Sequence, residues 1–470
     1  MVASTSAKDK DEWTSPFTPE RIDSRVAGKT LEEINDQFPT VSEIRNVIPA
    51  HCFDRSLFWS FFYLVLDLLQ GIFVWYITRH VIGLSSDAPS SPIWTWQWCL
   101  WRTAWNVYAV VMGFAVSGLW VLAHECSHGA FSKYPVLNGA VGLALHTFLC
   151  VPHFSWQFSH AKHHRRTNDL VDGESHVPAT HDEMGLTKKV GTKEQYKRLS
   201  PESVKAKISV FSNQGPMGFL SNPMYDHALK HQTLGDTGFA VFMMLSRLLL
   251  GWQLFLFGIS SNGKLGADQE PIANTEFPDH FRPSSRLFPS GMRWKVILSD
   301  VGVLVNVCLQ VYFSWCYSWQ AVWMWYWGPY VVVHAVVVTV TWLHHTHESV
   351  PNFDREQWSW MKTNIATTID RPGYWWLNHC THDINTTHLV HHIFPEIPHY
   401  RAMEATKAVR AYLEPKELYN YDPTDFCLAL WKVCKTCHFV DSDKNGVQYF
   451  KKLSDVPCLA AEVDAGKKDS

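Results

Sequence analysis

The sequence predicts an all-α integral membrane protein with four transmembrane helices, additional interfacial helices and a cytosolic helical cap. Two observations support this fold class. Hydrophobic residues make up 46% of the 470-residue chain, and they gather in segments that are too long for ordinary core helices. The second observation is a set of three histidine clusters, each of which lies beside such a segment. Together they indicate a metal-binding protein that is embedded in a membrane.

Six apolar segments approach the length of roughly 20 residues that a spanning helix needs. They cover residues 57–78, 103–123, 134–153, 237–259, 296–316 and 321–343. If all six crossed the membrane, the second histidine cluster would lie on the opposite side from the first and third. Because one metal site could not then use all three clusters, two segments must return to the side from which they entered.

Segments 134–153 and 237–259 are the best candidates for interfacial or re-entrant helices. The first contains glycines and ends near a proline, and the second has Arg247 near its middle. The other four segments form two hairpins. The loop inside the second hairpin has no charge, whereas residues 260–294 and the C-terminal region are rich in Lys and Arg. The positive-inside tendency therefore places the histidine clusters and both termini in the cytosol.

The same segments divide the chain into three regions. We expect an N-terminal cytosolic segment at 1–50, a membrane core with the three histidine clusters at 51–400, and a C-terminal cytosolic region and tail at 401–470. Eleven cysteines show no paired framework and are predicted to be reduced. A net charge of −3 without a basic stripe argues against a nucleic-acid partner.

The three histidine clusters share a spacing that suits metal binding. They read HECSH at 124–128, HAKHH at 160–164 and HLVHH at 388–392. On a helix, residues spaced i, i+3 and i+4 share a face, so each cluster can present two or three imidazoles in one direction. The candidate ligands are His124, His128, His160, His163, His164, His388, His391 and His392.

The number of imidazoles predicts two metal ions. Taken alone, HECSH matches the HExxH helix of zinc proteases, but eight histidines exceed what one tetrahedral zinc site can use. Two ions with five or six ligands each fit better, and imidazole suits iron as well as zinc. The Glu-x-x-His pairs of carboxylate-rich di-iron bundles do not recur here. The sequence therefore predicts a histidine-rich di-iron site held by the cytosolic cap.

At this point a family resemblance becomes clear. The strings HECSHGAFS, SHAKHHRRTND and THLVHHIFPEIPHYRAMEATKA resemble the three histidine boxes of membrane fatty acid desaturases, and they are most similar to the microsomal oleate delta-12 and omega-3 enzymes. The similarity extends from about Thr40 to about Lys452, which is nearly the whole chain. The resemblance implies that the eight box histidines are the catalytic metal ligands.

The resemblance also implies a ninth ligand at the cytosolic end of the last span. The chain reads Leu343-His344-His345-Thr346-His347 there, and we choose His345. His344 stands where relatives usually have glutamine, so His344 and His347 stay open as alternatives. His382 matches a family histidine and is open both as an outer-shell or reserve ligand and as a capping or solvent-facing residue.

Several carboxylates lie close to the boxes in the sequence. Glu125, Asp169 and Asp383 could orient ligand imidazoles by accepting their second N–H group. Asp67 lies inside the first span, where one carboxyl group can be satisfied by a neighbouring helix. We therefore expect a structural role for Asp67.

The resemblance implies an oxygen-dependent acyl-lipid desaturase that inserts a cis double bond into an unsaturated C18 chain. Oleoyl to linoleoyl is the expected conversion, with O2 as co-substrate. Omega-3 desaturation, acetylenation, conjugation and hydroxylation are variants on the same scaffold. The substrate would be an acyl-phospholipid or an acyl-CoA, bound in the surrounding membrane lipid.

Electrons must come from a separate protein. The chain has no HPGG segment of the cytochrome b5 type and no GxGxxG fingerprint after a strand. The resemblance implies cytochrome b5, reduced by its NADH-dependent reductase, as the donor in the endoplasmic reticulum membrane. The final residues Lys467 to Ser470 are similar to a dilysine retrieval signal and equally typical of a solvated tail.

Two hypotheses from other classes remain. A zinc-dependent membrane hydrolase would hold one zinc per chain, need no oxygen and lose activity when Glu125 alone is changed. A non-catalytic metal-binding or lipid-binding membrane protein would hold about two irons and desaturate no acyl chain.

Overall fold

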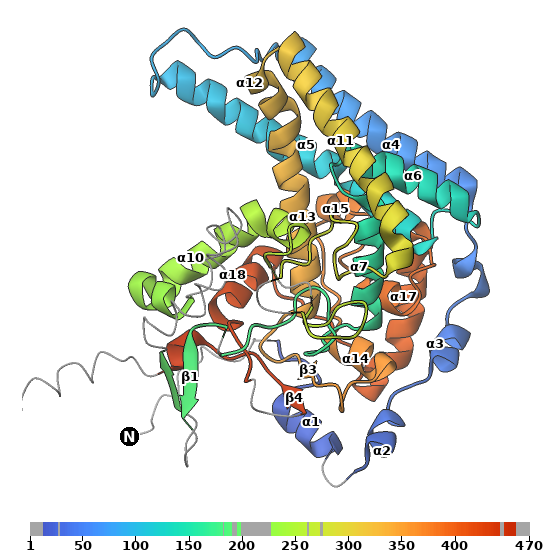
Figure 1. The fold of residues 1–470 in the computed structure, drawn as a ribbon. Helices are drawn as coiled ribbons and strands as arrows, with labels where there is room; N and C mark the ends of the chain where they lie inside the picture. Colours follow the sequence, from blue (N-terminus) through green and yellow to red (C-terminus); the bar gives the residue numbers. More distant parts are fainter. Residues whose placement is uncertain are drawn as a thin grey trace, which may run out of the picture.

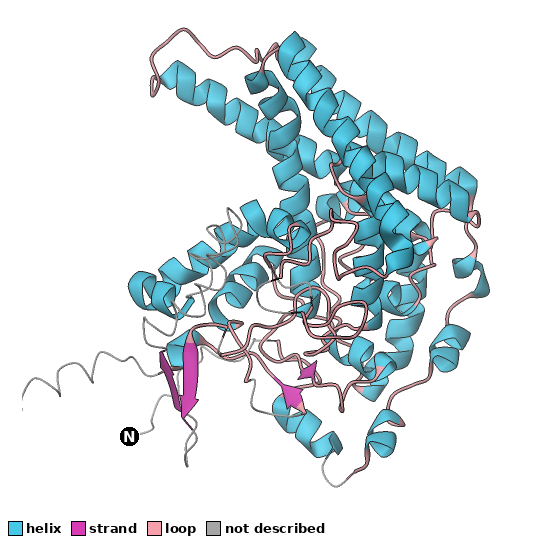
Figure 2. Cartoon of the chain, in the orientation of Figure 1, coloured by secondary structure: helices cyan, strands magenta, loops and turns pink. Residues whose placement is uncertain are grey.

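A computed structural model describes a predominantly helical chain (Figure 2). It describes residues 13–26, 29–181, 183–189, 195–198, 227–260, 263–272, 276–441 and 446–456. Most of the long helices gather at one end of the molecule, and shorter helices and loops gather at the other (Figure 1). The expected dilysine signal lies outside the described residues.

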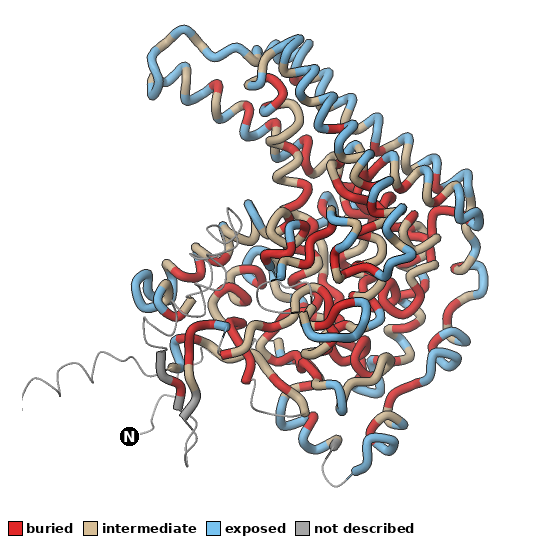
Figure 3. The backbone as a smooth tube through the Cα atoms, viewed as in Figure 1, coloured by how far each residue is buried: buried red, intermediate tan, exposed pale blue. Residues whose placement is uncertain are grey.

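Among the described residues, the long helices include the four expected spans and one segment that we expect to be interfacial or re-entrant. They are α4 (Leu57–Tyr76), α5 (Trp96–His128), α10 (His227–Leu256), α11 (Arg293–Cys316) and α13 (Gly328–His345). A π-helical turn, Ile77–Val81, continues α4, and a short helix α12 (Trp319–Val322) with a second π-helical turn, Trp323–Trp327, leads into α13. Exposed residues run along α4 and α11 (Figure 3), as is expected of helices that face lipid.

The described residues contain five helices long and apolar enough to span a membrane, one more than the four expected. The additional candidate is α10, which begins ten residues before the predicted segment 237–259. It is broken at Gly235, whose φ is 68°. It packs on α13 and on α18 (Phe426–Thr436), away from α4 and α11 (Figure 1).

Segment 134–153 does not form a straight span. It forms helix α6 (Pro135–Phe148), followed by α7 (His153–Arg165), and the two axes differ by 106°. The break falls at Cys150, whose φ is 54°, and at Pro152, which precedes the first residue of α7. This bend turns the second histidine box toward the first, in keeping with the expectation of an interfacial or re-entrant segment.

The remaining elements form a region that we call the cap. Its helices are α1 (Pro19–Val26), α2 (Leu31–Asn35), α3 (Val41–Val47), α14 (Trp360–Thr367), α15 (Trp375–Cys380), α16 (His388–Ile393), α17 (His399–Leu413) and α18, with 3₁₀ turns at Ala50–Phe53, Ser290–Met292, Glu414–Lys416 and Leu453–Asp455. Helices α2 and α3 each begin with a capping box, Thr30 with Glu33 and Thr40 with Glu43. Such boxes satisfy backbone N–H groups that a helix start would leave unpaired.

The cap departs from the all-α expectation at two small antiparallel sheets. Strand β1 (Leu186–Lys189) pairs with β2 (Gln195–Arg198), and β3 (Asn352–Phe353) pairs with β4 (Val447–Gln448). The second sheet joins two segments that lie almost 100 residues apart. Pairings of this kind cannot be predicted from the local hydrophobic pattern.

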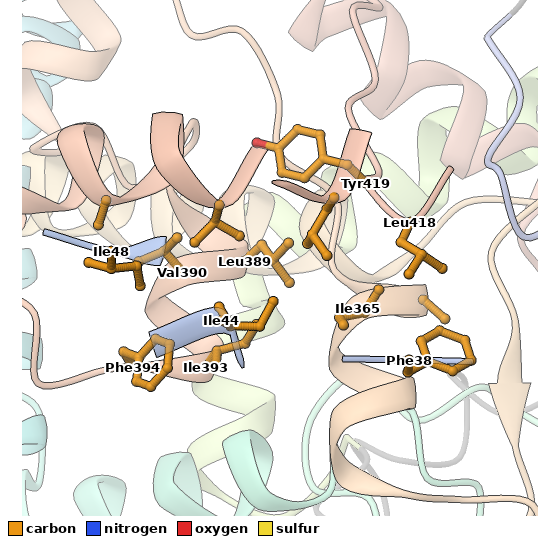
Figure 4. Close-up of a cluster of buried hydrophobic side chains, with 14 of the residues drawn as sticks. Phe38, Ile44, Ile48, Ile365, Leu389, Val390, Ile393, Phe394, Leu418 and Tyr419 are labelled. Atoms are coloured by element: carbon orange, nitrogen blue, oxygen red, sulfur yellow. The ribbon is translucent and has the colours of Figure 1, made fainter. Parts of the chain in front are cut away.

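A buried hydrophobic cluster holds the third histidine box from one side (Figure 4). Leu389, Val390 and Ile393 of α16 point into it, where they meet Ile44 of α3 and Ile365 of α14. Burial of each such side chain stabilises the fold by about 1.5–3 kcal/mol. Because the same short helix carries three histidines, its apolar residues fix the direction in which those histidines point.

Candidate metal centre

Four separate elements bring the predicted histidines together. Helix α5 ends in His124 and His128, and Gly129 stops it there with a φ of 75°. A left-handed residue at this position is a common helix stop that glycine adopts without a side-chain clash. Helix α7 supplies the second box, α16 supplies the third, and α13 supplies His345 in its last turn.

The nine histidines fall into two adjacent groups. Group 1 has ring nitrogens that all lie within 4.8 Å of one another, on His124, His128, His160, His164 and His391. Group 2 contains His163, His345 and His392, which meet the same distance limit. His388 joins group 2, because its Nε2 lies 3.1 Å from Nε2 of His345.

The second and third boxes each contribute to both groups. On α7, His160 and His164 are four residues apart and join group 1, whereas His163 joins group 2. On α16, His391 joins group 1 and His392 joins group 2. Each box therefore presents at least two imidazoles to one group, as its spacing predicts, but the second and third boxes also present one imidazole to the other group. The neighbouring imidazoles of these two boxes diverge enough to serve two ions.

The spacing of the ring nitrogens suits metal ions. Nε2 of His160 lies 2.9 Å from Nε2 of His124 and 3.1 Å from Nε2 of His164. Two nitrogens about 2.1 Å from one ion are about 3.0 Å apart at a right angle and about 3.4 Å apart at the tetrahedral angle. The observed distances therefore fit an ion with five or six ligands better than a tetrahedral one.

Hydrogen bonding within the protein does not satisfy these rings. Nε2 of His128, His391 and His392 is buried without a hydrogen-bond partner in the described part of the chain. An unpaired buried polar atom costs about 1–3 kcal/mol. A cation that accepts the lone pairs of these nitrogens would remove that cost, so the residues present fit a bound metal.

The protonation state of the histidines in the third box also suits metal binding. Burial, followed by the neighbouring histidines, lowers the pKa of His391 and His392 well below the ordinary value. Burial and the neighbouring His344 act in the same direction on the pKa of His388. These imidazoles are therefore neutral at pH 7, which is the form that binds metal.

Two neutral side chains contact the far nitrogens of the group 2 rings. The Ser175 hydroxyl lies 2.9 Å from Nδ1 of His163, and Oδ1 of Asn364 lies 3.0 Å from Nδ1 of His392. Such contacts fix the ring orientation and the tautomer of a ligand. Neither residue could be predicted from the sequence, because no motif connects Asn364 to a histidine 28 positions later.

The carboxylates proposed for this orienting role have other partners. Glu125 accepts hydrogen bonds from the backbone N–H of His399, at 2.6 Å, and from Nδ1 of the same residue, at 2.8 Å. Asp169 accepts from the backbone N–H groups of Val171 and Asp172. Asp383 interacts with Asn378.

His344, His347 and His382 lie outside both groups of converging ring nitrogens. Nδ1 of His344 donates to the carbonyl oxygen of Ile369, and its Nε2 is buried without a hydrogen-bond partner among the described residues. Nδ1 of His347 lies 2.8 Å from the Ser349 hydroxyl, and Nε2 of His382 lies 2.8 Å from Oδ2 of Asp67. The geometry therefore favours His345 as the ninth member of the centre.

A narrow apolar cavity adjoins both groups. The volume that a water-sized molecule could reach in it is about 40 Å³, so it is a slot between side chains rather than an open pocket. Its walls come from α5, α7, α13 and the segment before α16: Ser117, Trp120, Val121, His124, His160, His163, Val336, Val337, Val340, Thr341, Thr381, Ile384 and His388. Four of these residues are histidines of the two groups.

The hydroxyl groups in the cavity wall are turned away from any ligand. Ser117, Thr341 and Thr381 each donate to the carbonyl oxygen four residues earlier in their own helix, at 2.8, 2.9 and 2.7 Å. Such bonds consume the hydroxyl hydrogen. The cavity therefore presents mainly methyl groups and imidazole rings, which suits an alkyl chain.

The sequence of the chain matches the model of one protein family. The model of the fatty acid desaturase family matches residues 100–262 and 224–423. The chain is 34% identical to the Delta(12) fatty acid desaturase FAD2 of Calendula officinalis over 416 residues, which cover 88% of this chain and 91% of the relative. It is 32% identical to the Delta(12)-fatty-acid desaturase of Arabidopsis thaliana, over 87% of this chain and 89% of the relative.

Relatives with other names match equally well. The chain is 32% identical to the Delta(12) acyl-lipid conjugase (11E,13E-forming) of Impatiens balsamina over 413 residues, which cover 87% of this chain and 89% of the relative. Relatives of similar sequence therefore have names that refer to different reactions.

Proposed function

Because the chain belongs to the fatty acid desaturase family, and so is an oxidoreductase, we propose that it converts oleoyl lipid to linoleoyl lipid. The names of the relatives from Calendula officinalis and Arabidopsis thaliana support the delta-12 position. The product would be a cis double bond, and O2 would be reduced to water.

The single observation that carries this proposal is the contact between the apolar cavity and the two histidine groups. His124, His160, His163 and His388 belong to both. An alkyl chain in the cavity would gain about 0.8 kcal/mol for each buried methylene, and its carbons would lie against the metal-binding rings. An alkyl C–H bond has no acidic proton, so acid–base catalysis by side chains cannot break it.

The nine histidines of groups 1 and 2 would hold two iron ions. When bound, the irons supply the activation of O2 and the removal of two hydrogens from the chain. The protein's part is to hold the ligand rings, with Ser175 and Asn364 fixing two of them. Val337, Val340 and Ile384 exclude water from the cavity and align the acyl chain.

The contacts of Glu125 argue against the zinc hydrolase hypothesis. In an HExxH protease the glutamate activates the attacking water. Here both carboxylate oxygens of Glu125 accept hydrogen bonds from His399, and Glu125 does not line the apolar cavity. The five-histidine composition of group 1 also exceeds the three protein ligands of a catalytic zinc site.

We also propose cytochrome b5, with its NADH-dependent reductase, as the electron donor. The proposed setting is the endoplasmic reticulum membrane with the cap in the cytosol. A relative from Brassica juncea carries the name of an endoplasmic reticulum omega-6 desaturase, which supports this location. Antibodies against cytochrome b5 should inhibit NADH-dependent product formation in microsomes. Full activity in their presence would exclude this donor.

Expression in a yeast that makes no polyunsaturated lipid tests the proposed reaction. We expect linoleate to appear among the fatty acids separated by gas chromatography. The variant His163→Ala, produced at the same level, serves as the control that should yield none. A conjugated, acetylenic, hydroxylated or omega-3 product would overturn the delta-12 proposal and identify the variant reaction. No product from a well-expressed wild type would support a non-catalytic protein.

A further inference from the structure

Two buried carboxylates in the long helices contact histidines that are outside both metal groups. Asp67 lies on α4 and Glu125 on α5. Their partners are His382, six residues before the third box begins, and His399, seven residues after it ends. The third box is therefore bracketed by two contacts with different membrane helices.

The contact before the box is enclosed. Asp67 is 1% exposed and His382 is 7% exposed. Oδ2 of Asp67 lies 2.8 Å from Nε2 of His382, and Oδ1 accepts a hydrogen bond from Gln70 at 3.2 Å. Gly118 of α5 makes room for the carboxylate, because a Cβ atom at that position would lie 2.5 Å from Oδ2.

The contact after the box lies close to the first. The rings of His382 and His399 are 4.3 Å apart between centroids. Tyr63 of α4 packs edge-on against both rings, at 5.5 and 4.6 Å. Asp67, His382, His399 and Glu125 thus form one buried assembly, which we call the clamp.

The backbone next to the clamp is strained. His382 and Asp383 have φ values of 49° and 60°, two consecutive non-glycine residues in the left-handed region. Each such residue costs on the order of 1 kcal/mol and persists only where surrounding contacts hold it. The hydrogen bond from His382 to Asp67 is such a contact.

The strained segment connects the cavity to the metal centre. Thr381 and Ile384 line the cavity, and His388 both lines it and belongs to group 2. A shift of residues 381–387 would therefore move the cavity wall relative to the metal-binding rings.

We propose that Asp67 and His382 are positioning residues, which hold residues 381–387 so that the cavity wall and the third box keep one placement relative to group 1. A test that measures product rests on the proposed desaturation, whereas a test that measures the conformation of residues 381–387 does not. A misplacement of about 1 Å in an active site can reduce the rate about 100-fold, so loss of this contact should affect the reaction more than the amount of folded protein.

The test compares Asp67→Leu, which removes the hydrogen bond, with Asp67→Asn, which retains an acceptor for His382. We expect Asp67→Leu to lower product formed per NADH oxidised by at least about tenfold, while Asp67→Asn stays within about twofold of the wild type. The NADH oxidised by membranes that lack the protein is subtracted first, so that the ratio does not depend on how much protein folds. Equal ratios for Asp67→Leu and the wild type, or an equal loss in Asp67→Asn, would overturn the proposal.

Hydrogen exchange measured by mass spectrometry provides the readout that needs no reaction. Asp67→Leu should accelerate exchange of the backbone amides in 381–387. The control is Asp300→Leu on α11, where the Oδ1 atom that is lost has no hydrogen-bond partner among the described residues. Unchanged exchange in 381–387, or the same acceleration in the control, would contradict the proposal that the clamp holds these residues in place.

A second variant keeps the test decisive if Asp67→Leu does not fold. His382→Phe removes the same hydrogen bond by changing a residue outside the long helices. It should show the same decrease in product formed per NADH oxidised and the same faster amide exchange in 381–387. A His382→Phe protein that matches the wild type in both measurements would overturn the proposal. If the wild type makes no product, the proposed reaction fails, and the exchange data alone decide on the clamp.

Discussion

At the scale of single residues, the centre is a set of imidazoles whose lone pairs converge. Nε2 of His160 lies within 3.1 Å of two other ring nitrogens. A neutral imidazole has only one N–H group, so it cannot donate a hydrogen bond to both of them. The eight box histidines could be predicted from their spacing alone. His345 needed the family resemblance, and the geometry now favours it over three neighbours.

His345 and His347 give a matched pair of variants. His345→Ala should abolish desaturation and lower the iron content, because it removes a nitrogen from group 2. His347→Ala should retain most activity, since its ring belongs to neither metal group. Product analysis and metal analysis of both purified variants test the assignment. The opposite ranking would make His347 the ninth ligand.

Asn364 offers a prediction about ligand orientation. Its Oδ1 atom contacts Nδ1 of His392. Loss of such a partner typically lowers metal affinity about 10- to 100-fold, so Asn364→Ala should lose iron more readily to a chelator. Asn364→Asp retains an acceptor oxygen and should hold iron more firmly than Asn364→Ala. Identical chelation rates for the wild type and Asn364→Ala would contradict this role.

Glu174 gives a prediction about pH. Burial raises the pKa of Glu174 to about 8, against an opposing effect from Lys162 and with a further increase from Asp172. Both carboxyl oxygens are buried without a hydrogen-bond partner in the described part of the chain. The folded chain therefore prefers the protonated acid.

The free energy of unfolding should consequently fall as the pH rises from about 5 to about 8, and level off above that. Glu174→Gln should remove most of this fall. Thermal unfolding in detergent, measured across this pH range for both proteins, checks the sign. Parallel stability curves for the two proteins would show that Glu174 does not cause the dependence.

At the scale of elements, helix α16 shows how a short segment acquires two functions. His388, His391 and His392 meet the metal groups, and the intervening Leu389 and Val390 enter the hydrophobic cluster of the cap. Helical periodicity predicts that these residues fall on different faces. It does not predict which segments cover the apolar face, because α3 and α14 are distant in the sequence.

Leu389→Ala tests this dual role. Removal of a fully buried leucine side chain costs about 2–5 kcal/mol, so the thermal midpoint should fall and iron should be held less tightly. Leu428→Ala, at a position that is 47% exposed on α18, is the matched control with little effect. Equal thermal midpoints for the two variants would mean that the cluster does not support α16.

At the scale of the whole molecule, the metal centre joins elements that are distant in the sequence. The bend between α6 and α7 and the position of α16 bring the histidines of α5, α7, α13 and α16 together. The sequence predicted the apolar segments and the need for two of them to turn back, because ligands of one site must lie on one side. It did not predict the division of each later box between two groups, or the contacts of Ser175, Asn364 and His399. Those contacts depend on tertiary packing between residues that are 12, 28 and 274 positions apart.

We propose that the nine histidines hold two iron ions beside an apolar cavity. Metal analysis of the purified wild type, by mass spectrometry on protein of known concentration, is the decisive test. We expect about two irons per chain and almost no zinc, because each of the two sites would offer four or five imidazoles. One zinc per chain, without iron, would contradict it.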